Sequence, residues 1–271
     1  TQNQLQTCPR AHMFPDTPMT QWLQQQPKPC RVDTIGVPGI RPALMVPYGV
    51  EELWGYDGIY PARSKRIERL PERPNVWRQV EPLLAVSYYL MPPSILETQS
   101  FEHDRFEIIH RVDDLLVMRD RRAYPRAFFL PEVRTVANTD ALFDAMDQPG
   151  YSSRAIGLTE AAPAVPLPSV PADRLGEASV VARTGTRISV AATSELPSVL
   201  LLSEAYYPGW HAYIDGTETE IFPLFHAFRG IVFPAGKHMV EYRYEPASFF
   251  IGLYVSSATL IGVSLLALFM L

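Results

Sequence analysis

The chain has 271 residues, of which 47% are hydrophobic and 20% are charged, so it can build a sizeable core and is neither a disordered chain nor a coiled coil. Its 24 basic and 29 acidic residues give a net charge of −5, which argues against a nucleic-acid partner. The 26 prolines are about twice the usual share of roughly 5% and predict short strands and loops.

Residues 1–160 are predicted to form a mixed α+β subdomain. After a Gln- and Pro-rich start, a short strand is expected from Arg31, and a long Gly- and Pro-punctuated stretch then leads to a basic helical segment at 62–70. The apolar run 81–91 fits either a buried central strand or a short helix that flows into one. Short strands are expected at 104–111, 113–122 and 126–133, and a short helix at 139–146 with Asn138 or Thr139 as its cap.

A proline-rich segment at 161–175 is the expected linker between two subdomains, because four prolines between 161 and 171 favour an extended connection. Beyond it, residues 176–246 contain seven short segments of alternating polarity, which predict a β-sandwich of jelly-roll type. Asp215-Gly216 lies between two of these segments and is typical of a two-residue hairpin turn.

The C-terminal segment 247–271 is predicted to cross a membrane. No formally charged residue follows Glu245, and the apolar run 249–271 would form a helix about 34 Å long, enough for a bilayer core of roughly 30 Å. A buried helix of a soluble core is the alternative, but such a helix usually carries a polar stripe. The protein is therefore expected in a membrane, with the sandwich at the bilayer surface.

The N-terminal end leaves two alternatives open. The sequence starts at Thr1 without a basic segment and apolar run of the signal-peptide kind. Either a signal was removed, or these residues come from the later part of a longer membrane protein. Cys8 and Cys30 are likewise open between a disulfide in an oxidising compartment and two free thiols.

Several motifs together resemble the YfhO family of polytopic bacterial membrane proteins. The strongest are SEAYYPGWHAYIDG at 203–216, HAFRGIVFPAGKH at 226–238 and VEYRYEPASF at 240–249, the last running into the hydrophobic segment. YGVEELWGYDGIY at 48–60, LLAVSYYL at 83–90 and PRAFFL at 125–130 resemble further segments of that family, in the same order. The similarity covers most of residues 31–260.

The resemblance implies an extracytoplasmic domain of a GT-C-like glycosyltransferase in the bacterial cell membrane. Such a protein would transfer a sugar from a polyprenyl-phosphate donor to a cell-envelope glycan. In GT-C enzymes the catalytic acid lies in an early extracytoplasmic loop, which is outside these residues, so the resemblance implies no catalytic residue here. The expected role is accessory, namely to position the acceptor. The alternative is a membrane-anchored carbohydrate-binding or scaffold module without catalysis.

Two aromatic segments are candidate substrate contacts. The first, at 51–57, combines carboxylates with aromatic side chains, a composition that suits contact with a sugar or a lipid headgroup. Its alternatives are acid/base chemistry and a loop held by its own buried aromatics. The second, at 206–210, could be an exposed aromatic platform, although we favour a structural role at one end of the sandwich. The candidate residues are Glu51, Glu52, Trp54, Tyr56, Asp57, Tyr207 and Trp210.

Metal, nucleotide and nucleophile chemistry find no support in the sequence. The six histidines show no metal-ligand spacing, and there is neither a glycine-rich phosphate loop nor a nucleophile elbow. We therefore expect no cofactor, no metal and no nucleic acid. The expected partners are the lipid bilayer, a polyprenyl-phosphate-linked sugar and a cell-envelope glycan acceptor.

Overall fold

The computed structural model describes residues 14–35, 45–54, 61–98 and 101–269, and these residues form two compact units and a long C-terminal helix. Unit 1 comprises residues 1–60 and 80–125, and unit 2 comprises residues 61–79 and 126–271. The chain thus leaves unit 1, contributes a helical segment to unit 2, returns, and then completes unit 2. The predicted α+β class is confirmed.

Unit 1 is built around a five-stranded mixed sheet of order β2-β1-β3-β5-β4. Its strands are β1 (Arg31–Thr34), β2 (Glu51–Glu52), β3 (Tyr88–Met91), β4 (Phe106–Val112) and β5 (Leu115–Asp120). Strand β1 runs parallel to β2 and β3, whereas β5 is antiparallel to β3 and β4. The short helices are α2 (Pro18–Gln24), η1 (Val46–Tyr48), η3 (Glu81–Leu84) and η4 (Pro93–Glu97).

The apolar run 81–91 follows the second of its two predicted alternatives. Helix η3 occupies its first turn, Ala85 ends that turn with φ 51°, and β3 then enters the centre of the sheet. All four residues of β3 are buried, as expected for a central strand covered on both faces. Cys30, just before β1, is a buried free thiol whose pKa is raised by burial, while Cys8 lies outside the described residues.

Unit 2 contains a β-sandwich, as predicted. One sheet has the order β13-β12-β16-β10-β9 and the other β14-β15-β11-β6. The strands are β6 (Ala127–Leu130), β9 (Glu177–Arg183), β10 (Arg187–Ser194), β11 (Ser198–Ala205), β12 (Trp210–Ile214), β13 (Thr217–Thr219), β14 (Phe222–Leu224), β15 (Phe228–Phe233) and β16 (Gly236–Tyr244).

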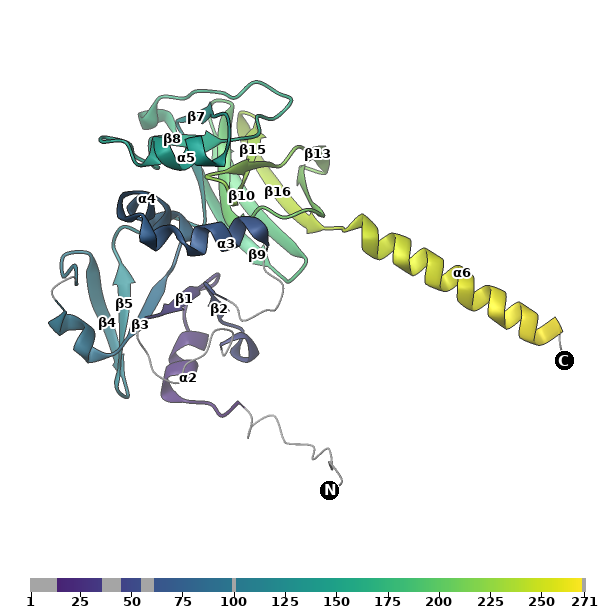
Figure 1. The fold of residues 1–271 in the computed structure, drawn as a ribbon, viewed down its shortest axis with the longest axis horizontal. Helices are drawn as coiled ribbons and strands as arrows, with labels where there is room; N and C mark the ends of the chain where they lie inside the picture. The colour runs from purple at the N-terminus through teal and green to yellow at the C-terminus, as the bar shows by residue number, and fades with distance from the viewer. Residues whose placement is uncertain (1–13, 36–44, 55–60, 99–100, 270–271) are drawn as a thin grey trace. The chain divides into compact units, whose positions relative to one another are not determined.

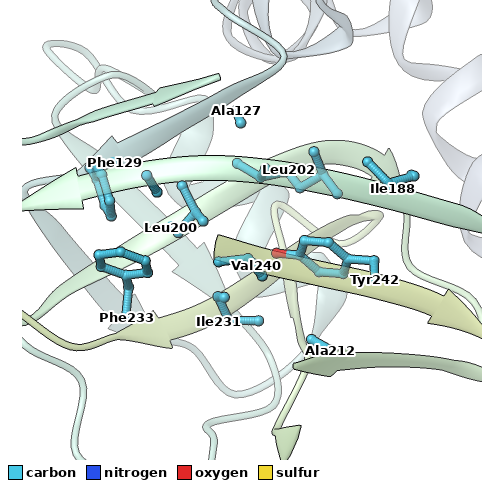
Figure 2. Close-up of a cluster of buried hydrophobic side chains, with 12 residues drawn as sticks. Ala127, Phe129, Ile188, Leu200, Leu202, Ala212, Ile231, Phe233, Val240 and Tyr242 are labelled. Atoms are coloured by element: carbon cyan, nitrogen blue, oxygen red, sulfur yellow. The ribbon is translucent and has the colours of Figure 1, made fainter. Parts of the chain in front are cut away.

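Alternating apolar residues from both sheets fill the core of the sandwich, as Figure 2 shows. Phe129 of β6 and Phe233 of β15 meet edge to face with ring centroids 5.2 Å apart. Val190 of β10, Leu200 of β11 and Val240 of β16 are fully buried beside them. Burial of an aliphatic or aromatic side chain contributes about 1.5–3 kcal/mol, so this cluster accounts for much of the stability of unit 2.

The division of the chain differs from the expected boundary at 161–175. Strand β6 precedes the proline-rich segment, yet Leu130 of β6 pairs with Val199 of β11, which follows it. The segment therefore lies within unit 2. The rest of this unit consists of α3 (Ala62–Glu68), η2 (Leu70–Glu72), α4 (Pro74–Val80), α5 (Thr139–Met146), η5 (Ala172–Arg174) and the parallel pair β7 (Glu132–Thr135) and β8 (Ile156–Thr159).

Helix α6 (Ala247–Phe269) runs without interruption to the end of the described chain (Figure 1). It is long and apolar enough to cross a membrane, and none of its residues is buried within the protein. The hydroxyls of Thr259 and Ser264 donate back to the carbonyl oxygens of Val255 and Leu260, so they do not oppose burial in lipid.

Candidate functional site

A pocket of about 170 Å³ opens in unit 2, at the end of the sandwich where the chain passes from β11 to β12. Its wall is formed by that connection, by the first two residues of β12, by β13 and the residues that follow it, and by one residue of β15. The lining residues are Tyr206, Tyr207, Pro208, Trp210, His211, Glu218, Thr219, Glu220, Ile221 and Arg229. Two of the sequence-predicted site residues, Tyr207 and Trp210, thus contribute to one pocket.

The aromatic wall of the pocket is held by the last residues before α6. Trp210 pairs with Tyr244 across β12 and β16, and the two rings lie with centroids 5.4 Å apart. Gly209 turns the chain at φ +90°, and a Cβ at this position would lie 3.0 Å from the ring of Tyr244. Tyr207 is 43% exposed. Within this segment Trp210 packs at the end of the sandwich, whereas Tyr207 faces solvent.

Arg229 contributes a buried cation to the pocket. Its side chain is 3% exposed, its guanidinium carbon lies 3.8 Å from the centroid of the Trp210 ring, and its Nε donates to the carbonyl oxygen of Ala205 at 2.9 Å. Its Nη1 is buried and finds no hydrogen-bond partner among the described residues. Burial lowers the pKa of Arg229 to about 10, so the group still carries its charge at neutral pH.

Two further arginines, Arg126 and Arg183, carry positive charge in the surroundings of Arg229. Arg126 and Arg183 both pair with the carboxylate of Glu204, and the charge of Glu204 also stabilises that of Arg229. Glu204 thus pairs with two guanidinium groups and interacts through its charge with a third. This side of the pocket favours a negatively charged or oxygen-rich ligand.

The rim of the pocket carries two exposed carboxylates. Glu218 accepts a hydrogen bond from Nδ1 of His211 at 2.7 Å when that nitrogen is protonated. Glu220 accepts one from the backbone N–H of Ala164 at 2.8 Å. A ligand in the pocket would therefore meet carboxylate oxygens at the edge, an aromatic wall and a guanidinium at the base. Aromatic faces and carboxylate oxygens are groups that can contact the ring face and the hydroxyls of a polar ring.

The other predicted candidates belong to unit 1. Glu51 and Glu52 form β2, and Oε2 of Glu52 accepts a hydrogen bond from the backbone N–H of Met45 at 2.9 Å. Trp54 is half-buried, whereas Tyr56 and Asp57 lie outside the described residues. The hydroxyl of Tyr48 donates to the carbonyl oxygen of Pro15. Among the described residues of this segment, Tyr48 and Glu52 thus support local structure.

One carboxyl of unit 1 has an unusual pKa that the sequence did not signal. Asp33 lies on β1, next to the strand that carries Glu52. Burial raises the pKa of Asp33 to about 6, with further contributions from the negative charges of Glu81 and Glu52, although the N–H of Thr34 opposes the shift at 2.8 Å.

A second polar cluster in unit 2 was also missed by sequence reasoning. Oε1 of Glu160 accepts hydrogen bonds from Arg63 and His226, and Nη1 of Arg63 donates to the carbonyl oxygen of His226 at 2.7 Å. Burial alone would raise the pKa of Glu160, but the hydrogen bonds from His226 and Arg63 lower it to about 2. Glu160 Oε2 and His226 Nε2 are both buried without a partner in the described part of the chain.

This cluster is connected to the pocket and is backed by strained backbone. The guanidinium of Arg63 lies 5.2 Å from the centroid of Tyr206, a residue of the pocket wall. Phe225 and His226 both have positive φ, 47° and 71°, which is costly for residues other than glycine. Within the described ranges, no group of three or more His, Cys, Asp or Glu side chains could hold a metal ion.

Residues 173–256 match the model of the family described as bacterial membrane protein YfhO. The match covers the last eight strands, the pocket residues of the β11–β12 connection and of β12, β13 and β15, and the start of α6. It confirms the YfhO resemblance over this region, while the resemblance of the earlier segments stays a prediction. Neither the curated proteins nor the solved structures give a match. The YfhO match and the apolar α6 together place the protein in a membrane, in contact with lipid.

Proposed function

We propose that this chain is the extracytoplasmic, acceptor-positioning part of a polytopic membrane glycosyltransferase. The parent protein would transfer a sugar from a polyprenyl-phosphate donor to a cell-envelope glycan, with its catalytic acid outside these residues. The match to YfhO supports a role in a bacterial membrane. The composition of the Trp210 pocket supports contact with carbohydrate.

The observation that carries this proposal is the position of the pocket along the chain. Trp210 is paired with Tyr244, and α6 begins at Ala247. Three residues span at most about 10 Å, so the pocket wall lies close to the point where the chain enters the bilayer. A lipid-linked sugar also has its sugar at the membrane surface. A pocket this close to the membrane surface can hold an acceptor near the donor without supplying a catalytic group. Such positioning matters, because misplacement of a substrate by about 1 Å can cost on the order of 100-fold in rate.

The test is sugar transfer by the full-length protein in membranes, measured for Trp210→Phe, Tyr207→Ala and Trp54→Ala. Circular dichroism and detergent extraction would serve as checks on folding. We expect Tyr207→Ala to reduce transfer at least tenfold while the protein stays folded. Undiminished transfer in the folded Tyr207→Ala and Trp210→Phe variants would remove the pocket from the proposal, and an effect of Trp54→Ala alone would move the contact to unit 1.

The second candidate function is a membrane-anchored carbohydrate-binding or scaffold module without catalysis. Its support is the same pocket and the same helix, because neither requires a catalytic parent. The length of the complete reading frame distinguishes the two. About ten hydrophobic spans upstream of Thr1 would favour the transferase, whereas a signal peptide directly before Thr1 would favour the module.

A further inference from the structure

Arg229 has donors that the described protein does not use. Its only hydrogen bond among the described residues is the one from Nε to Ala205, although a guanidinium offers five N–H donors. A buried arginine normally pairs with a carboxylate, since an unpaired buried charge is costly. Glu204 is the carboxylate whose charge acts on Arg229, but it is already paired with Arg126 and Arg183. The free donors at the base of the pocket therefore call for acceptor oxygens from a ligand.

The size of the pocket restricts that ligand. At about 170 Å³ it is smaller than a pocket for a drug-sized molecule, which takes roughly 300–1,000 Å³. It has room for one small ring and its substituents, not for several sugar residues. The aromatic faces of Tyr207 and Trp210 suit the apolar face of such a ring. A purely inorganic anion would leave this aromatic wall without a partner.

We propose that the Trp210 pocket binds a single sugar residue that carries an anionic oxygen group, a carboxylate or a phosphate ester. Arg229 receives the anionic oxygens, and the aromatic wall receives the ring. Glu218 and Glu220 at the rim accept hydrogen bonds from the ring hydroxyls. The inference rests on the proposed role in handling envelope carbohydrate, and it adds the charge of the sugar that the site selects.

The experiment is calorimetric titration of the full chain in neutral detergent micelles with four probes: glucuronate, glucose 1-phosphate, glucose and inorganic phosphate. We expect at least one of the two charged sugars to bind tenfold or more tightly than both glucose and inorganic phosphate. Equal affinity for glucose and the charged sugars would overturn the role of the anion. Inorganic phosphate that binds as tightly as the charged sugars would overturn the role of the sugar ring.

Variants separate the contributions of the two walls. Arg229→Met should abolish the preference for the charged sugar, and Arg229→Lys should retain part of it because a point charge remains. Tyr207→Ala, at an exposed position, should weaken binding of the charged sugar and leave that of inorganic phosphate unchanged. Binding of the charged sugar that is unaffected by Tyr207→Ala would contradict the proposal even if the Arg229 variants do not fold.

Arg243→Met is the matched control. Arg243 also lies over an aromatic ring of the sandwich, 4.5 Å from the centroid of Tyr213, but it is paired with Glu241 and does not line the pocket. Its substitution should leave all four affinities unchanged. The binding experiment and the transfer assay can fail separately. A protein that transfers no sugar can still bind a charged one, and a protein that binds none can still be tested for transfer.

Discussion

Arg63 and His226 are 163 residues apart in the chain, yet Nη1 of Arg63 donates to the carbonyl oxygen of His226 at 2.7 Å. This bond fixes α3 to the turn between β14 and β15. It also explains why the segment 61–79 belongs to unit 2 although unit 1 surrounds it in sequence. Arg73, between α3 and α4 on the same segment, pairs with Asp144 and Asp147 around the end of α5, so the segment is attached at a second point.

The stabilising contribution of Glu160 should be lost in acid. Its pKa is lowered to about 2 in the folded protein from an unfolded value near 4.5, so its contribution is fully present above pH 4.5 and is lost as the pH falls toward 2. Glu160→Gln should destabilise by about 2 kcal/mol at pH 7 and flatten this dependence. Melting temperatures between pH 2.5 and 7 would measure it, and parallel curves for the two proteins would contradict it.

Asp33 should give the opposite pH dependence and lower the stability of the protein at neutral pH. Its pKa is raised to about 6 from an unfolded value near 3.8, so the stability it allows is present below pH 3.8 and is lost as the pH rises through 6. Asp33→Asn should therefore stabilise the protein at pH 7 by about 1–2 kcal/mol, because the variant carries no charge to bury. Its melting temperature should exceed that of the native chain at pH 7 but not at pH 4. A gain of the same size at both pH values would point to another cause.

Asp215 should be intolerant of proline. It has φ 48° and Gly216 φ 86°, as the two-residue turn between β12 and β13 requires, and the Asp215 carboxylate accepts hydrogen bonds from His238 and from the N–H of Met239. Proline cannot adopt this φ, so Asp215→Pro should destabilise by more than about 1 kcal/mol. Asp215→Asn, which tolerates the backbone conformation, should cost less. Equal melting temperatures for the two variants would contradict the turn assignment.

Helix α6 should determine the solubility of the chain. Its side chains are exposed throughout, and burial of each CH₂ in lipid contributes about 0.8 kcal/mol. The full chain should therefore need detergent, whereas a chain that ends at Pro246 should be monodisperse without it. Size-exclusion chromatography of both chains in plain buffer makes the comparison. A full chain that elutes as a monomer there would show that α6 is covered in another way.

The sandwich could be predicted because its signals are local. Strand alternation gave its segments between residues 178 and 244, and Asp215-Gly216 gave a turn. Strand β14 was not expected because Pro223 interrupts it; it lies at the edge of its sheet, where a proline is tolerated. The place of β6 beside β11 could not be predicted, since the pairing crosses the proline-rich segment and depends on packing rather than on local sequence.

The candidate site was predicted only where it is continuous in sequence. Tyr207 and Trp210 lie three residues apart and stood out as an aromatic segment. Arg229 belongs to one of the motifs that resemble YfhO, but its burial depends on β15 and β12, which meet only in the fold. Glu160 gave no signal of its own, since its partners come from distant segments.

Strand β16 occupies the centre of its sheet and leads through Glu245 and Pro246 directly into α6. It pairs along eight residues with β10 and along five with β12. A pull on the membrane helix is therefore applied as shear along the central strand of this sheet, and many backbone hydrogen bonds must break together before the strand can yield. The sandwich is thus mechanically firm where it joins α6, and Tyr244, which packs against Trp210, is the last residue of the strand that would carry the load.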